Sequence, residues 1–116
     1  MQLSQETINT FIGGQIEIIN TREEYHYRGE IQRIWLDHEE LAIEFRWFAQ
    51  RNSQGEWSIA PPTLYRASRM IYAMQEISEG RVFLKANNYG FTELATLFPK
   101  GGSRLDPAKV RGLNLV

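Results

Sequence analysis

The stretch LAIEFRWF at residues 41–48 decides the fold, because its side chains alternate in character. Every second position is a large apolar residue, namely Leu41, Ile43, Phe45 and Trp47. Successive side chains of an extended chain point to opposite faces, so a period of two predicts a strand with one buried face. A turn-forming cluster, Asn52 to Gly55, follows and predicts a return strand with Trp57 and Ile59 on one face.

The segment before this strand, residues 25–36, also reads as a long strand. Gly29 lies near its middle and predicts a sharp bend, because a residue without a Cβ tolerates close approach of other atoms. Ile31 and Ile34 are three positions apart, which breaks the alternation and predicts a β-bulge.

Residues 64–77 allow two interpretations. Leu64, Ala67, Ile71 and Met74 fit one face of a helix, but an apolar run, a glycine-containing turn and a second apolar run are typical of a hairpin. We therefore predict strands at 69–77 and 81–86, with the helix as the alternative.

The N-terminus predicts a short helix over residues 4–12. Ser4 is a good N-cap, and Gly13 with Gly14 ends the helix. Ile8, Phe11 and Ile12 share one face, through which we expect the helix to pack.

Composition bounds the protein class. The chain has 116 residues, 42% of them hydrophobic and 12% aromatic, with a net charge of −1 and no cysteine. These values predict one globular domain. The sequence shows no signal peptide and no apolar run long enough for a membrane span, so we expect a cytoplasmic protein that does not enter a membrane.

Together these patterns predict a mainly β fold, a small SH3-like antiparallel barrel with a short N-terminal helix. The barrel domain covers residues 1–98, and residues 99–116 form a flexible basic C-terminal segment with a short helical turn begun by Asp106 and Pro107. We expect the core to be filled by apolar residues of the strands: Ile16, Ile18, Ile31, Leu41, Ile43, Phe45, Val82 and Leu84.

The order of elements over residues 8–45 resembles the Sm-like family. The resemblance lies in Gly14, the strand at 16–18, Gly29 with Ile31, Asp37, and the strand at 41–45. It implies a small barrel of a kind that binds RNA and usually assembles into rings. The acidic Glu39 or Glu40 stands where the family places an asparagine, and the late Ile-Arg-Gly motif is missing from the barrel region. The resemblance therefore supports the barrel shape and does not carry RNA binding with it.

Aromatic and arginine side chains on the strands at 25–36 and 41–48 form the candidate binding surface. It comprises Tyr25, Tyr27, Arg28, Arg33, Trp35, Arg46 and Phe48. Such a mixture suits a protein partner, self-association or single-stranded bases. We predict that at least two of the four aromatic residues are exposed in one patch, since so small a barrel cannot enclose them all.

The charges are unevenly spread along the chain. Residues 1–60 hold ten acidic and five basic residues, and residues 61–116 hold four acidic and eight basic residues. The candidate contacts for a polyanion are the bases of the C-terminal segment, Lys100, Arg104, Lys109 and Arg111. Nucleic acid is therefore the alternative partner, and we predict that residues 99–104 are mobile.

No residue pattern commits to catalysis, a cofactor or a metal. His26 and His38 stand at opposite ends of one predicted strand, roughly 40 Å apart if it is straight. The acidic turn at 37–40 lacks the alternation and the glycine of a calcium loop. We therefore expect a non-enzymatic binding or scaffold module that uses no cofactor.

Overall fold

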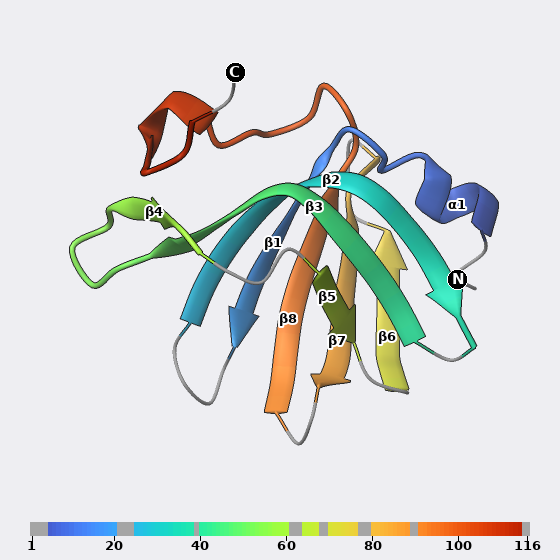
Figure 1. Cartoon of the computed structure of the whole chain (residues 1–116). Helices are drawn as coiled ribbons and strands as arrows, with labels where there is room; N and C mark the ends of the chain where they lie inside the picture. Colours follow the sequence, from blue (N-terminus) through green and yellow to red (C-terminus); the bar gives the residue numbers. More distant parts are fainter. Residues whose placement is uncertain are drawn as a thin grey trace.

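The computed structural model shows a small curled β-sheet with one short helix (Figure 1). It describes residues 5–20, 25–38, 40–60, 64–67, 70–76, 80–88 and 91–114. Within these ranges, side chains are described except at 20, 25, 65–67, 70–76, 86–88, 91 and 92. The prediction of a mainly β fold is confirmed.

The described elements follow one another in chain order. They are α1 (Gln5–Asn9), β1 (Gln15–Asn20), β2 (Tyr25–Asp37), β3 (Glu40–Arg51), β4 (Trp57–Ile59), β5 (Leu64–Ala67), β6 (Met70–Glu76), β7 (Val82–Asn88), β8 (Phe91–Phe98), the 3-10 turn η2 (Pro107–Lys109) and β9 (Val110–Arg111). Within residues 64–77, the described residues 64–67 and 70–76 form strands, whereas the predicted strand bounds at 69 and 77 lie outside the described residues. The apolar segment after residue 90, which the sequence left without a type, is the strand β8.

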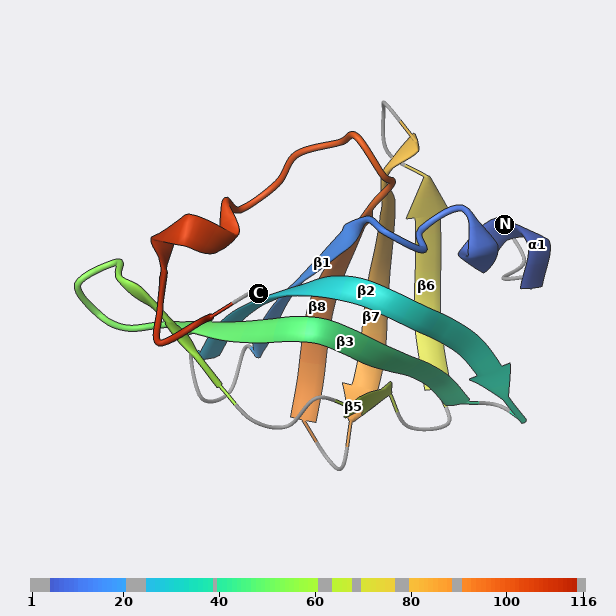
Figure 2. The ribbon, with the colours of Figure 1, turned by 45° about the horizontal axis from the view of Figure 1, so that its top comes forward.

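The strands form one sheet in the order β6-β7-β8-β1-β2-β3-β4-β9, with β5 paired to β3 beside β4. All neighbours are antiparallel except β4 and β9, which are parallel. The sheet curls so that β5 contacts β7 (Figure 2). In the described ranges no ladder joins β5 to β6, so the sheet is not closed and a barrel is not confirmed.

The inner face of the curled sheet holds the main core. All eight positions expected there are at most 4% exposed, which confirms the alternation as a guide: Ile16, Ile18, Ile31, Leu41, Ile43, Phe45, Val82 and Leu84. Burying a side chain of this size contributes about 1.5–3 kcal/mol. Alternating burial therefore fixes the register of the central strands, because a slip of one residue would expose this whole set.

Gly29 and two bulges bend the long β2–β3 pair. A Cβ at Gly29 would lie 2.5 Å from Cδ1 of Phe45 and 3.1 Å from Cδ2 of Phe48, so the two rings take the place of a side chain. The ladder shifts register on either side of Ile31, which confirms the predicted bulge. The bulges leave Arg46 and Gln32 without ladder partners.

The N-terminal helix is shorter than predicted and packs through two residues of the three. Ile8 and Phe11 are buried, whereas Ile12 is 45% exposed. The helix ends at Asn9 and the chain turns over residues 10–13, which rotates Ile12 away from the sheet. Gly14 then passes close over the end of β8, where an added Cβ would be 2.0 Å from the carbonyl oxygen of Phe98. Expecting Ile12 in the packed face was therefore wrong.

We predict that Gly29→Ala lowers the free energy of unfolding by about 1–3 kcal/mol, because the new methyl group overlaps the Phe45 ring. Urea denaturation measures the change. The double variant with Phe45→Leu serves as the control, since it removes the overlapping ring. An equal cost of Gly29→Ala in both backgrounds would contradict the packing explanation.

Candidate functional site

The predicted aromatic surface is not an exposed patch. Phe48 is 6% exposed, and its ring stacks between Tyr27, at 5.0 Å, and Phe45, at 4.8 Å. The bulge at Arg46 causes this, because it brings Phe45 and Phe48 to the same inner face although they are three positions apart. Tyr27 is half-buried against the core, and the side chain of Tyr25 lies outside the described residues. Placing Phe48 on the surface was therefore wrong.

The remaining members of that surface lie apart from one another. The Arg33 guanidinium lies 4.7 Å from the ring of half-buried Trp35, and Arg33 also lies 3.6 Å from Glu44. Trp35 is eight positions from Tyr27, about 26 Å along a strand. Arg28 is 7% exposed, and Arg46 pairs with Glu30. The structure thus divides the predicted residues among the core, the outer face and the far end of β2.

The outer face of the sheet is covered by the C-terminal arm, which we define as residues 104–113. This segment runs back from the end of β8 to β4 (Figures 1 and 2). The predicted helical turn is present, with the Asp106 side chain accepting a hydrogen bond from the Ala108 N–H at 3.0 Å. Residues 99–104 were expected to be mobile, and that stays a prediction. The arm itself packs on the sheet as an integral part of the fold.

Gln15 holds the backbone of the arm. The Leu105 N–H donates to Gln15 Oε1 at 2.9 Å, and Gln15 Nε2 donates to the Leu105 carbonyl oxygen at 3.1 Å. Gln15 is fully buried at the start of β1. Both polar groups of one residue of the arm are therefore satisfied by one side chain of the sheet.

A second apolar cluster joins the arm to the outer face. Trp47 and Ala49 of β3 and Val110 of the arm are buried, and Leu105 and Leu113 pack against them with Trp57 of β4. In addition, β9 extends the sheet by pairing Val110 with Trp57 and Arg111 with Ser58. Strand β3 is thus buried on both of its faces, because Trp47 and Ala49 point to the arm while Ile43 and Phe45 point to the main core.

Two ion pairs fix the arm at its ends. Arg104 Nη2 donates to Glu30 Oε1 at 2.5 Å, while Arg46 Nη1 donates to the other oxygen of the same carboxylate at 3.3 Å. Near the far end, Arg111 pairs with Glu56. Two of the four predicted polyanion contacts are therefore bound to carboxylates. Among the described residues, Lys100 and Lys109 are exposed and have no acidic partner.

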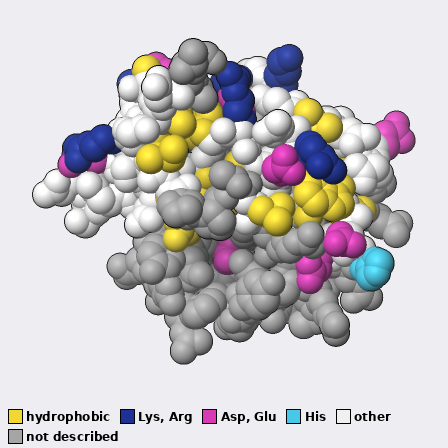
Figure 3. Space-filling view, viewed as in Figure 1, with side chains coloured by type: hydrophobic (Ala, Val, Ile, Leu, Met, Phe, Trp, Pro, Cys, Tyr) yellow, Lys and Arg dark blue, Asp and Glu magenta, His cyan; other side chains and the backbone are white. Residues whose placement is uncertain are grey.

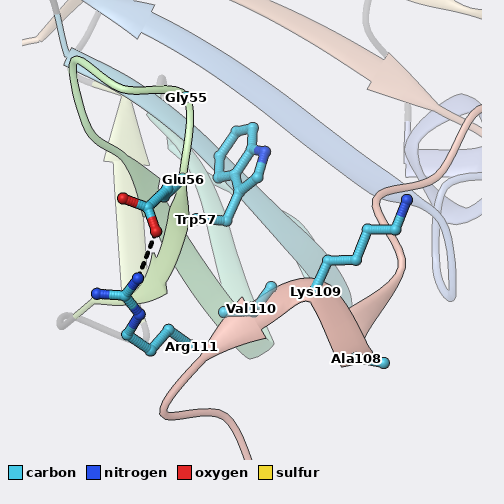
Figure 4. Close-up of a pocket in the computed structure, with 7 residues that line it drawn as sticks. All are labelled: Gly55, Glu56, Trp57, Ala108, Lys109, Val110 and Arg111. Carbon is cyan, nitrogen blue, oxygen red and sulfur yellow. Dashed lines mark hydrogen bonds and ion pairs between the residues drawn. The ribbon is translucent and has the colours of Figure 1, made fainter.

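A cavity of about 300 Å³ lies between the arm and the hairpin that joins β3 to β4 (Figure 4). Trp57 and Val110 form its apolar wall, and the Glu56–Arg111 pair closes one side. The Lys109 side chain points away from that pair. The cavity is a part of the seam between the arm and the sheet.

Arg28 and Trp47 carry buried hydrogen-bond donors on the outer face of the sheet. Among the described residues, neither Arg28 Nη1 nor Trp47 Nε1 has a partner, and both atoms are buried. The Arg28 guanidinium lies 4.4 Å over the Phe98 ring. Burial lowers the pKa of Arg28, and the nearby Glu17 carboxylate partly restores it.

The Glu17 carboxylate lies beside the His26 ring. His26 Nε2 lies 3.2 Å from Glu17 Oε2, outside hydrogen-bond geometry, and the His26 ring packs edge-on against Trp57 at 5.1 Å. His38 instead lies in the β2–β3 turn beside Asp37, so the two histidines do not meet. The described residues contain no group of three metal-ligating side chains and no helix long and apolar enough to cross a membrane.

The sequence matches no family model, and the searches of curated proteins and of solved structures give no match. The Sm-like resemblance over residues 8–45 stays a prediction. The site holds the C-terminal arm of the same chain against the outer face of β1–β4.

Sequence reasoning missed the residues that make this face, above all Gln15, Trp47 and Trp57. Trp47 looked like a core residue because it alternates with Ile43 and Phe45. Leu105, Val110 and Leu113 gave a usable signal, since a purely solvated tail has no need of three large apolar residues.

We predict that Gln15→Ala loosens the arm, because it leaves the backbone of Leu105 unpaired at a cost of about 1–3 kcal/mol. Limited trypsin digestion should then cleave after Arg104 about 5- to 100-fold faster. Gln32→Ala, at an exposed position of β2, is the matched control and should change nothing. Equal cleavage rates for both variants would contradict the clamp.

We also predict that Arg28→Met keeps or raises the free energy of unfolding. Removing a buried charge that has no hydrogen-bond acceptor is often neutral or stabilising. Glu30→Gln, which weakens two ion pairs, should instead lower the free energy of unfolding by about 1–2 kcal/mol. Thermal melts of the two variants measure the change in the free energy of unfolding. If Arg28→Met lowers it as much as Glu30→Gln does, Arg28 is a structural residue.

Proposed function

We propose that this chain is a non-enzymatic protein-interaction module that binds an extended polypeptide on the outer face of β1–β4. Its own C-terminal arm takes that place in cis. We also propose an SH3-like small barrel. Strand β5 pairs with β3 and the next strand, β6, pairs with β7, so consecutive strands link the two ends of the curled sheet. The proposal also includes a cytoplasmic location, which the absence of cysteine suits.

The observation that carries the proposal is the clamp of Gln15 on Leu105. A buried side chain that binds both polar groups of a backbone residue recognises an extended chain regardless of its side chains. Pairing of β9 with β4 adds a second backbone contact of the same kind. Specificity comes from the apolar cluster around Trp47, which takes Leu105, Val110 and Leu113.

The outer end of the arm is held by a weak contact. The Arg111–Glu56 pair is exposed, and such pairs contribute less than about 1 kcal/mol. The connection to β8 contains Gly101 and Gly102, so the arm is tethered by a short glycine-containing segment. A tethered ligand acts at an effective concentration on the order of millimolar, which an external peptide must exceed.

Nucleic acid is less well supported as the partner. Arg104 and Arg111 already neutralise Glu30 and Glu56, which leaves Lys100 and Lys109 of the four candidate contacts. In the space-filling view, the coloured basic side chains are scattered among acidic and apolar ones (Figure 3). A strong polyanion binder would gather its basic residues on one face.

A labelled peptide of residues 103–114 tests the function by fluorescence anisotropy. Val110→Asp places a charge in a buried position and should release the arm. We expect this variant to bind the peptide at least tenfold more tightly than the wild-type chain, where the arm competes.

The control peptide carries serine in place of Leu105, Val110 and Leu113, and it should not bind. Circular dichroism shows whether Val110→Asp folds, and Leu113→Ala is the milder replacement if it does not. Equal affinity for both peptides, or saturable binding of a single-stranded RNA oligomer in their place, would overturn the proposal.

A further inference from the structure

We infer that the polypeptide bound on this face carries an acidic side chain, which Arg28 binds. The inference rests on the proposed function and adds the chemistry of the partner. Arg28 lies on the same outer face as Trp47, since Arg28 is opposite Ala49 and Glu30 is opposite Trp47 in the β2–β3 ladder. The two are diagonal neighbours, about 7–8 Å apart at their backbones.

Arg28 is buried in the outer face, and its Nη1 has no acceptor in the part of the chain that the structure describes. The residue is 7% exposed. Its contact with Phe98 is to the ring face, at 4.4 Å. A guanidinium has five N–H donors in its plane, and an aromatic ring face does not satisfy them as a carboxylate does.

The charge of Arg28 is balanced only at a distance. Glu17 attracts it, but the Glu17 carboxylate lies 3.2 Å from His26 instead. A buried donor that gives up water without gaining an acceptor is costly, and for a charged donor the cost is larger. An incoming carboxylate would remove that cost with two parallel hydrogen bonds.

The arm packs on Trp47 but gives its indole N–H no acceptor among the described residues. The contact is made through Val110. The acidic residue of the arm, Asp106, is turned toward Ala108 as a cap. The arm therefore leaves donors of this face without an acceptor, and a partner with a free carboxylate would supply one.

A carboxylate suits this position better than a phosphate. Arg28 supplies one positive charge, and Glu17 stands beside it. Glu17 repels both anions, but it repels a dianion about twice as strongly, and the dianion also exceeds the single charge of Arg28. The site therefore distinguishes an aspartate or glutamate peptide from a phosphopeptide.

The experiment uses the peptide of residues 103–114, in which aspartate is introduced at each position other than Leu105, Val110 and Leu113. Every aspartate peptide has a matched asparagine peptide, and Kd values are measured on the Val110→Asp chain. At one position we expect aspartate to bind at least tenfold more tightly than asparagine. A phosphoserine at that position should bind less tightly than aspartate.

The same series on the double variant Val110→Asp/Arg28→Gln assigns the effect. The ratio of asparagine to aspartate Kd should fall to about one, and Arg28→Lys, which keeps the charge but lacks the planar fork, should leave an intermediate ratio. This inference alone is overturned if the asparagine-to-aspartate Kd ratio is one at every position on the Val110→Asp chain that keeps Arg28. It is also overturned if a ratio above ten is unchanged by Arg28→Gln. If neither the parent peptide nor any aspartate peptide binds, the proposed function fails and the inference fails with it.

Discussion

The approach of the Phe45 and Phe48 rings to the backbone of Gly29 is the constraint on which the rest of the structure depends. Only a residue without a Cβ fits under these rings, so the β2–β3 pair is bent at this place. The bend and the bulges beside it bring Tyr27, Phe48 and Phe45 into one internal stack. On the opposite face of the bent pair, Trp47 and Ala49 become the floor beneath the arm.

A strand that is buried on both faces has a consequence for the outer surface. Trp47 and Ala49 need cover, and the main core on the other side of β3 cannot supply it. The C-terminal arm supplies that cover with three apolar residues and a backbone clamp. The arm is therefore required for the fold to bury the outer side of β3.

Most of the fold could be predicted from the sequence because alternation and turn residues act locally. Ile43 and Phe45 were placed in the core by spacing alone, and the bulge was visible in the three-residue step from Ile31 to Ile34. The site could not be predicted in the same way. The bulge at Arg46 reverses the facing of Phe48, and the Gln15–Leu105 contact joins residues 90 positions apart. Neither effect leaves a periodic trace in the sequence, since both depend on tertiary contacts.

The residue at position 28 of the outer face is not the one that local stability favours. An apolar residue at position 28 would pack between Glu17 and Phe98 without the cost of a buried charge, yet the chain has arginine there. Glu30, only two residues away on the same face, shows how the fold treats a buried charge that serves structure, since two arginines bind its carboxylate. Arg28 is treated differently, because its Nη1 is buried and has no acceptor among the described residues. A donor kept in that state stabilises a complex more than it stabilises the free chain, which is the property expected of a recognition residue.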